Sequence, residues 1–331
     1  MATTEPKVSV SIDLEAEGKQ FGHLSIPHSH NESGWGAVHL PIVSIAGGTG
    51  PTVVLTGGNH GDEYEGPIAL LKLVRALEPE QVSGRVIVIP ALNFPAVMAG
   101  TRVSPIDGVN MNRAYPGKRD GSVTQMIAHF VQEKIIPRCQ GLMDIHSGGK
   151  TMTFSPFAAY HRLEDPELTA RCKEAALAAG APITLELVEL DAAGMLDTAV
   201  EEAGRVFVST ELGGGGTTTT DTVAIAERAV AGFLGHMGAT EAPPPARASR
   251  VMHMPDAGCY AIAEEAGLYE ALVDLDQPVA KGDAIGQIHF PARPERPPEV
   301  YRAGTAGTLI GRSHKVLIAP GDFLGLIAQD I

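Results

Sequence analysis

The sequence predicts an α/β protein, with a sheet flanked by helices and a smaller β-domain at the C-terminal end. Short apolar runs alternate with segments of helical periodicity up to about residue 236, the pattern of strands and helices that build one sheet. A proline-rich segment at 241–246 follows, and the pattern beyond it changes to short apolar runs with Gly-Asp turns. In α/β sheets the loops at the carboxyl ends of strands hold the ligands, so candidate site residues should follow the strands.

The elements of the first part can be taken in chain order. A strand at 53–56 ends in two glycines, and a helix follows from about Pro67, with an apolar stripe at Ile68, Leu71, Val74 and Leu77. A helix at 122–136 begins with a capping box and stops at Pro137. The remaining elements are expected as strands at 86–89, 142–145, 184–190 and 206–212 and as helices at 165–180 and 224–236.

The predicted domain boundary is the segment Glu-Ala-Pro-Pro-Pro-Ala at 241–246, which should be extended rather than helical. We expect a catalytic domain over 1–240, with an N-terminal β extension over about 1–50, and a C-terminal β-domain over 247–331. In the latter, residues 279–288 echo residues 318–327. The two units look like halves of a barrel-sandwich, but no lysine-bearing hairpin lies between them, which argues against a carrier role.

Composition and charge exclude several classes of function. The formal net charge is -14, with 39 acidic against 25 basic residues, so no basic face is available for nucleic acid. No apolar run reaches the roughly 18 residues of a membrane span, and the first ten residues lack a signal-peptide pattern. The three scattered cysteines are expected as buried thiols rather than disulfides. We therefore expect a cytoplasmic protein that acts on small molecules, with or without assembly into a homo-oligomer.

A candidate metal site begins with His60 and Glu63, which follow the first strand in the segment GGNHGDEYEG at 57–66. The spacing of three lets an imidazole nitrogen and a carboxylate converge on one cation, and zinc accepts that mixture of ligands. Four glycines in this segment favour a functional loop, because glycine costs conformational entropy unless the backbone must approach something closely. The alternative is a flexible, solvated loop whose histidine is satisfied by other partners.

His146 is the candidate third ligand, because it ends an apolar strand in the segment DIHSGG and should emerge at the same end of the sheet. Three protein ligands and one open position are typical of a catalytic rather than a structural zinc. Asp144 could support His146 through a hydrogen bond or could cap a turn, and the sequence leaves both open.

Other polar residues suit catalysis or substrate binding. Glu211 ends an apolar run ahead of four glycines and could act as a general base or cap the following turn. Asn112 and Arg113 offer an amide and a guanidinium that could hold a substrate carboxylate. Arg102 could supply a cation to a developing oxyanion, although either arginine could instead form an ordinary ion pair.

The ordered set formed by these residues resembles the succinylglutamate desuccinylase/aspartoacylase family of zinc carboxypeptidase-like enzymes, over about residues 50–235. The resemblance implies a mixed sheet of the carboxypeptidase type and one zinc ion per chain, held by His60, Glu63 and His146. It also implies that Asn112 and Arg113 bind the substrate α-carboxylate, that Arg102 polarises the scissile carbonyl, and that Glu211 transfers protons.

The function implied by the resemblance is hydrolysis of the amide bond of an N-acyl amino acid. Within the family, the length and the loops look most like bacterial enzymes of ectoine breakdown that deacetylate N-α-acetyl-L-2,4-diaminobutyrate. Many aspartoacylase-like members carry Asn-Glu-His-Gly-Asn-Glu where this chain has Gly-Asn-His-Gly-Asp-Glu at 58–63, a departure that keeps the ligand spacing and affects only fine specificity. The alternatives are a deacylase of another N-acyl amino acid, a peptide-cleaving zinc carboxypeptidase, and a non-enzymatic ligand-binding module.

Overall fold

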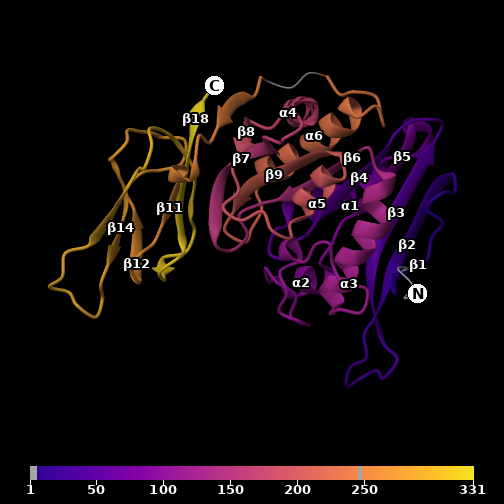
Figure 1. Cartoon of the computed structure of the whole chain (residues 1–331), viewed down its shortest axis with the longest axis horizontal. Helices are drawn as coiled ribbons and strands as arrows, with labels where there is room; N and C mark the ends of the chain where they lie inside the picture. Colours follow the sequence, from indigo (N-terminus) through magenta and orange to yellow (C-terminus); the bar gives the residue numbers. More distant parts are fainter. Residues whose placement is uncertain (1–5, 245–247) are drawn as a thin grey trace.

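The structure is a computed structural model that describes residues 6–244 and 248–331. Within these residues a 14-stranded mixed sheet is covered by helices, and a 4-stranded sheet stands at the C-terminal side (Figure 1). The main sheet has the order β1-β2-β3-β5-β4-β6-β9-β7-β8-β10-β18-β16-β13, and β11 pairs with β18. The small sheet has the order β15-β14-β12-β17. The predicted class of a mixed sheet with flanking helices is confirmed.

The strands and helices have the following bounds. The strands are β1 (Ser9–Val10), β2 (Gly18–Pro27), β3 (Ala37–Gly47), β4 (Thr52–Gly57), β5 (Gly84–Ile89), β6 (Gly141–His146), β7 (Met152–His161), β8 (Ile183–Leu187), β9 (Val206–Gly214), β10 (Arg250–His253), β11 (Tyr260–Ile262), β12 (Gly267–Ala271), β13 (Pro278–Val279), β14 (Ala284–His289), β15 (Glu299–Arg302), β16 (Gly307–Ser313), β17 (Leu317–Ile318) and β18 (Phe323–Asp330). The α-helices are α1 (Glu65–Ala76), α2 (Phe94–Ala99), α3 (Val123–Phe130), α4 (Pro166–Ala179), α5 (Leu196–Glu202) and α6 (Thr220–His236). Short 3-10 or π turns are η1 (Pro79–Gln81), η2 (Met111–Arg113), η3 (Val131–Ile135), η4 (Ile136–Arg138) and η5 (Ala257–Cys259).

The centre of the main sheet is parallel, which places the ends of several strands together. β4 pairs in parallel with β5 and β6, and β6 pairs in parallel with β9. These strands are apolar without alternation because both of their faces are covered. Successive residues such as Leu142 and Met143 belong to two different cores, one against α3 and α5 and the other against α1, α4 and α6. The carboxyl ends of β4, β6 and β9 therefore open at one end of the sheet.

The buried face of α1 differs from the predicted apolar stripe. Ile68 and Leu71 are 36% and 47% exposed, whereas Ala69 and Leu70 lie in the core. The predicted stripe advanced in uniform steps of three residues, which drift around a helix that has 3.6 residues per turn. The buried positions Leu70, Val74 and Leu77 follow steps of four and three residues, and Val74 and Leu77 are the predicted positions that stay inside.

Two further differences concern strands near the site. The strand predicted at 184–190 ends at Leu187, and β7 was absent from the prediction. β7 contains Pro156, which cannot donate to a sheet ladder, and the pairing of β7 with β9 shifts register between Phe154 and Phe157. The capping box at Ser122 is present as predicted.

The C-terminal strands are joined to the main sheet. Both echoed units contain a two-residue strand, a turn and a longer strand, β13 with β14 and β17 with β18. β10 pairs with β8, β16 pairs with β7, and Figure 1 shows the yellow C-terminal strands beside β7 and β8. The division into units at 1–240 and 247–331 stays a prediction. Residues 245–246 of the predicted linker lie outside the described residues, and 241–244 have no regular secondary structure.

Two expectations about the whole chain can be compared with the described residues. All three cysteines, Cys139, Cys172 and Cys259, are free and buried, as predicted. No helix in the described ranges is both long and apolar enough to span a bilayer.

Candidate active site

The three predicted metal ligands come together at the carboxyl ends of β4 and β6. Nδ1 of His60 lies 2.8 Å from Oε1 of Glu63, and Nδ1 of His146 lies 2.8 Å from Oε2 of the same carboxylate. All three side chains are buried, and one ligand atom from each lies within 4.8 Å of the other two. The geometry therefore brings two imidazoles and one carboxylate to a single point.

The loop that carries His60 packs tightly because it contains glycine. A Cβ atom on Gly61 would lie 2.0 Å from the carbonyl carbon of Ala96 in α2, and one on Gly66 would lie 2.7 Å from the carbonyl oxygen of Ile145 in β6. Both neighbours are backbone atoms, which cannot move aside as a flexible side chain can. The glycines of this segment thus allow a close approach to the backbone of α2 and β6. This packing fixes His60 beside β6.

The electrostatics of this cluster suit a bound cation. Burial would raise the pKa of Glu63, but the adjacent imidazoles of His60 and His146 outweigh it and lower that pKa. Burial lowers the pKa of His60, which favours the neutral imidazole. Metal ligands must be deprotonated, so Glu63 and His60 already have the required form. His146 keeps a proton: burial opposes it, but the Asp144 and Glu63 carboxylates raise its pKa well above the usual value.

Asp144 supports His146 rather than capping a turn. Its Oδ2 lies 2.7 Å from Nε2 of His146 and accepts a hydrogen bond from Nδ2 of Asn59 at 2.8 Å. Its Oδ1 accepts a hydrogen bond from the hydroxyl of Thr56 at 2.6 Å. This carboxylate fixes the imidazole so that the opposite nitrogen faces Glu63, as supporting carboxylates do in metal sites.

Two asparagines that the sequence did not single out complete this support. Asn59 holds Asp144, and Oδ1 of Asn110 lies 3.1 Å from Nε2 of His60. Asn110 also caps the η2 turn by accepting a hydrogen bond from the backbone N–H of Asn112. Asn59 lies inside the segment at 57–66 and Asn110 lies two residues before Asn112, and this nearness to predicted site residues was the only signal available for them.

Glu211 enters the same space from β9. It lies opposite His146 in the parallel register of β6 and β9, and no hydrogen bond reaches its Oε2 from the described residues. β9 continues to Gly214, so Glu211 does not cap a turn at the strand end. Burial, assisted by the negative charge of Glu63, raises the pKa of Glu211 to about 8.

The three remaining predicted residues lie around the same cavity. Nη1 of Arg102 is 3.3 Å from Oε1 of Glu63. Oδ1 of Asn112 accepts hydrogen bonds from Nδ2 of Asn59 and from the N–H of Leu196, which leaves its amide nitrogen as a donor. Arg113 donates from Nη1 to the backbone carbonyl of Asn112 at 2.7 Å.

These residues surround one cavity of about 130 Å³. Six of the seven predicted residues line it, and Glu63 lies behind the two histidines. The lining also includes residues that the sequence analysis did not select, chiefly Leu187, Glu189, Met195 and Asp197. Glu189 follows the end of β8, so the strand-end argument used for His146 applied to it as well.

Comparison with known proteins identifies the family of this chain. The model of the succinylglutamate desuccinylase/aspartoacylase catalytic domain matches residues 49–237, more than half of the chain. The chain therefore belongs to this family. The predicted family is confirmed, and with it the prediction of a hydrolase that acts as a deacylase on linear amides.

Relatives within the family cover almost the whole chain. The N-alpha-acetyl-L-2,4-diaminobutyric acid deacetylase of Halomonas elongata is 46% identical over 324 residues, 97% of this chain and 95% of that protein. The product-bound structure of the ectoine utilization protein EutE (DoeB) from Ruegeria pomeroyi has 45% identity and a TM-score of 0.96, covering 98% of this chain and 99% of that chain. A succinylglutamate desuccinylase from Silicibacter sp. TM1040 has 44% identity and a TM-score of 0.94, covering 99% of both chains.

Proposed function

We propose that this chain is a zinc-dependent amidohydrolase that converts N-α-acetyl-L-2,4-diaminobutyrate to 2,4-diaminobutyrate and acetate in ectoine breakdown. The observation that carries the proposal is the similarity, over 97% of the chain, to a deacetylase of that compound. The gathering of two histidines, four acids and two arginines around one cavity, with Glu63 in contact with the histidines, supports hydrolysis at this place. We also propose that the sheet around the site is of the zinc carboxypeptidase type.

One zinc ion per chain is the proposed cofactor, held by His60, Glu63 and His146. The set of two nitrogen donors and one carboxylate fits zinc, and all three residues are buried at one point. When bound, the ion would polarise the scissile carbonyl and make water more acidic. Asp144 would hold His146 in the tautomer that a ligand needs.

Asn112 and Arg113 would bind the α-carboxylate of the substrate. The amide nitrogen of Asn112 and the guanidinium of Arg113 are both donors, and both residues line the cavity. This contact would place the amide bond beside Glu211. Arg102, whose guanidinium lies at Glu63, would donate to the carbonyl oxygen as negative charge develops on it.

Glu211 would transfer the proton. Its free Oε2 would take a proton from water as the water oxygen bonds to the carbonyl carbon. The same proton would then pass to the amide nitrogen as the carbon–nitrogen bond breaks, which releases the amine and acetate. Burial raises the pKa of this carboxyl to about 8 in the chain without metal, and a cation at the three ligands would lower it, so that Glu211 could accept a proton from water and pass it on.

The proposal also covers the location of the enzyme in the cell, its substrate and its assembly. We infer a cytoplasmic location from the free, buried state of all three cysteines. The partner is a small N-acyl amino acid, and assembly into a homo-oligomer is compatible with this site.

The test is an assay of the zinc-loaded protein on a panel of N-acyl amino acids. N-α-acetyl-L-2,4-diaminobutyrate should be hydrolysed with the highest kcat/KM, ahead of N-acetylaspartate and N-succinylglutamate. A higher kcat/KM for either of these would replace the proposed substrate. Release of C-terminal residues from peptides at a comparable rate would instead favour a carboxypeptidase.

A further inference from the structure

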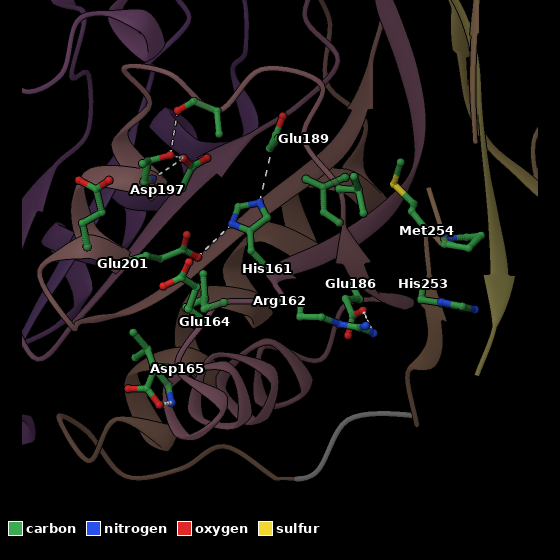
Figure 2. A pocket seen from close by; sticks show the side chains of 18 residues that line it. His161, Arg162, Glu164, Asp165, Glu186, Glu189, Asp197, Glu201, His253 and Met254 are labelled. Carbon is green, nitrogen blue, oxygen red and sulfur yellow. Dashed lines mark hydrogen bonds and ion pairs between the residues drawn. The ribbon is translucent and has the colours of Figure 1, made fainter. Parts of the chain in front are cut away.

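A larger, acidic cavity adjoins the catalytic one. A second cavity of about 1040 Å³ lies beside it, and Leu187, Glu189 and Asp197 line both. Figure 2 shows this second cavity, where carboxylates from the loop after β8 and from α5 surround the imidazole of His161. The boundary between the two cavities is therefore formed by Leu187 and two acids, and we call the two acids the acidic wall (Glu189 and Asp197).

One cation lies among these acids. Nδ1 of His161 is 2.9 Å from Oε1 of Glu201, and its Nε2 is 3.8 Å from Oε1 of Glu189. Although burial opposes it, the neighbouring carboxylates of Glu189 and Glu201 raise the pKa of His161 to about 10. Three carboxylates, those of Glu189, Asp197 and Glu201, thus face one imidazolium. An excess of negative charge remains beside the catalytic cavity.

Asp197 combines burial with a place on the catalytic cavity. It is only 5% exposed, and its Oδ1 accepts the hydrogen bonds of the Thr198 N–H and hydroxyl. It also lines the catalytic cavity, and one of its carboxylate oxygens lies within 4.8 Å of ligand atoms of His161 and Glu189. A carboxylate removed from water in this way is costly, and a cationic group of a ligand in the cavity would offset that cost.

We propose that the acidic wall binds the side-chain ammonium group of the substrate and thereby selects N-acyl amino acids with a positively charged side chain. This inference rests on the proposed function, because the compound named there carries such an ammonium group. The cavity then has opposite charges at two places: Asn112 and Arg113 receive the α-carboxylate, and Glu189 and Asp197 receive the ammonium group. A substrate with both groups is oriented by both contacts at once.

A metal ion is the other ligand that His161, Glu189 and Asp197 could hold, since their ligand atoms lie within 4.8 Å of one another. The ammonium group is favoured because Glu189 and Asp197 also line the catalytic cavity, where the substrate would lie, whereas His161 lines only the larger cavity.

The test compares N-α-acetyl-L-2,4-diaminobutyrate with N-acetyl-L-norvaline, which has a methyl group in place of the ammonium group. D197N keeps an oxygen that can accept the Thr198 hydrogen bonds, and E189Q removes only the second charge. Each variant should lower kcat/KM for the cationic substrate by roughly 10- to 100-fold, as expected for a lost charged hydrogen bond. Turnover of the norvaline compound should stay within about threefold of the wild type.

E202Q is the matched control, because Glu202 is an exposed carboxylate of α5 that lines only the larger cavity. It should leave both substrates unchanged. An equal loss for both substrates in D197N and E189Q, or no loss for either, would overturn the proposal. A fall from two zinc ions per chain to one in D197N would assign the cluster to a metal and would overturn it as well.

Binding of the products separates this inference from the proposed function. By calorimetry, the zinc-loaded wild type should bind 2,4-diaminobutyrate more tightly than norvaline, and D197N should remove the difference. If the wild type binds both equally, the acidic wall has no such role even where the acetylated compound is hydrolysed. If the acetylated compound is not hydrolysed but the binding difference is present, the proposed function fails and the inference holds.

Discussion

His146 and Glu211 lie directly opposite each other on the neighbouring parallel strands β6 and β9. Neighbouring strands are about 4.8 Å apart, so a candidate metal ligand and a candidate proton carrier enter one cavity at a spacing that the sheet fixes. The sheet, rather than a mobile loop, thus holds both groups, and their roles can be tested by single substitutions that leave the sheet intact.

Replacing Glu211 with glutamine should slow turnover and leave zinc binding intact. Glutamine keeps the size of the side chain but cannot take a proton from water, so kcat should fall by roughly a hundred- to ten-thousand-fold. KM and zinc content should be close to those of the wild type, since neither the carboxylate contact nor the three ligands change. Turnover, zinc and melting temperature should be measured on one preparation, and near-normal turnover would remove this role from Glu211.

Zinc content should depend on His146, which is a proposed ligand, and on Asp144, which holds His146 in place. His146→Ala should abolish tight binding of zinc, because two ligands remain. Asp144→Asn should weaken zinc binding by roughly 10- to 100-fold, the usual loss when a carboxylate that supports a histidine ligand is removed. Asp274→Asn, at an exposed site, is the control. Full zinc content in His146→Ala would show that the ligand set is wrong.

Zinc binding should release protons, and its affinity should fall as the pH falls. In the metal-free chain the raised pKa of His146 keeps this ligand protonated near pH 7, so the proton must leave before zinc binds. Glu211, with a pKa of about 8, is also mostly protonated there and should lose its proton beside a cation. Calorimetry in two buffers of different ionisation enthalpy should give roughly one to two protons per zinc. Zinc binding without proton release at pH 7 would contradict this.

The substrate should need a free α-carboxylate. In Arg113→Ala the KM for the N-acetyl substrate should rise by roughly 10- to 100-fold, as expected for the loss of a charged hydrogen bond. The methyl ester of the same substrate should react poorly with the wild type and should be little affected by the substitution. Equal turnover of acid and ester by the wild type would remove this role from Asn112 and Arg113.

The tight packing of the His60 loop gives a structural prediction. Gly61→Ala would place a methyl group against the backbone of α2 and should destabilise the chain by about 1–3 kcal/mol. It should also weaken zinc binding, since His60 would be displaced. Gly34→Ala is the control, because a Cβ atom there meets no other atom within 4 Å. Thermal unfolding and zinc titration of both variants would show whether the loop tolerates the change.

The sequence was most informative where a polar residue ends a buried strand. Parallel strands end together, so His146 and Glu211 could be placed at one end of the sheet without knowing the tertiary structure. The loop after β4 could be added because its acid and its histidine have the spacing of metal ligands. The prediction failed for Ile68 and Leu71 of α1, because a stripe that advances in steps of three residues drifts around a helix with 3.6 residues per turn.

Residues that act through contacts distant in the sequence could not be found in this way. Asn59 contacts Asp144, 85 positions away, and nothing in its neighbourhood in the sequence shows that contact. Asp197 reaches the cavity from the beginning of a short helix that has no ligand motif. Its position depends on how α5 packs against β9, which is a property of the whole fold.

The joining of the C-terminal strands to the main sheet has a consequence for the folding of the chain. Leu185 of β8 and Phe154 of β7 share a core with Met252, Ile310 and Leu326, which lie beyond the proline-rich segment. A truncated chain that stops at residue 240 would lack part of that core. It would also leave the backbone groups of β8 that pair with β10 without partners, and such an exposed strand edge promotes aggregation. The full chain should therefore unfold in one cooperative transition, and the part that carries the catalytic cavity should not be soluble by itself.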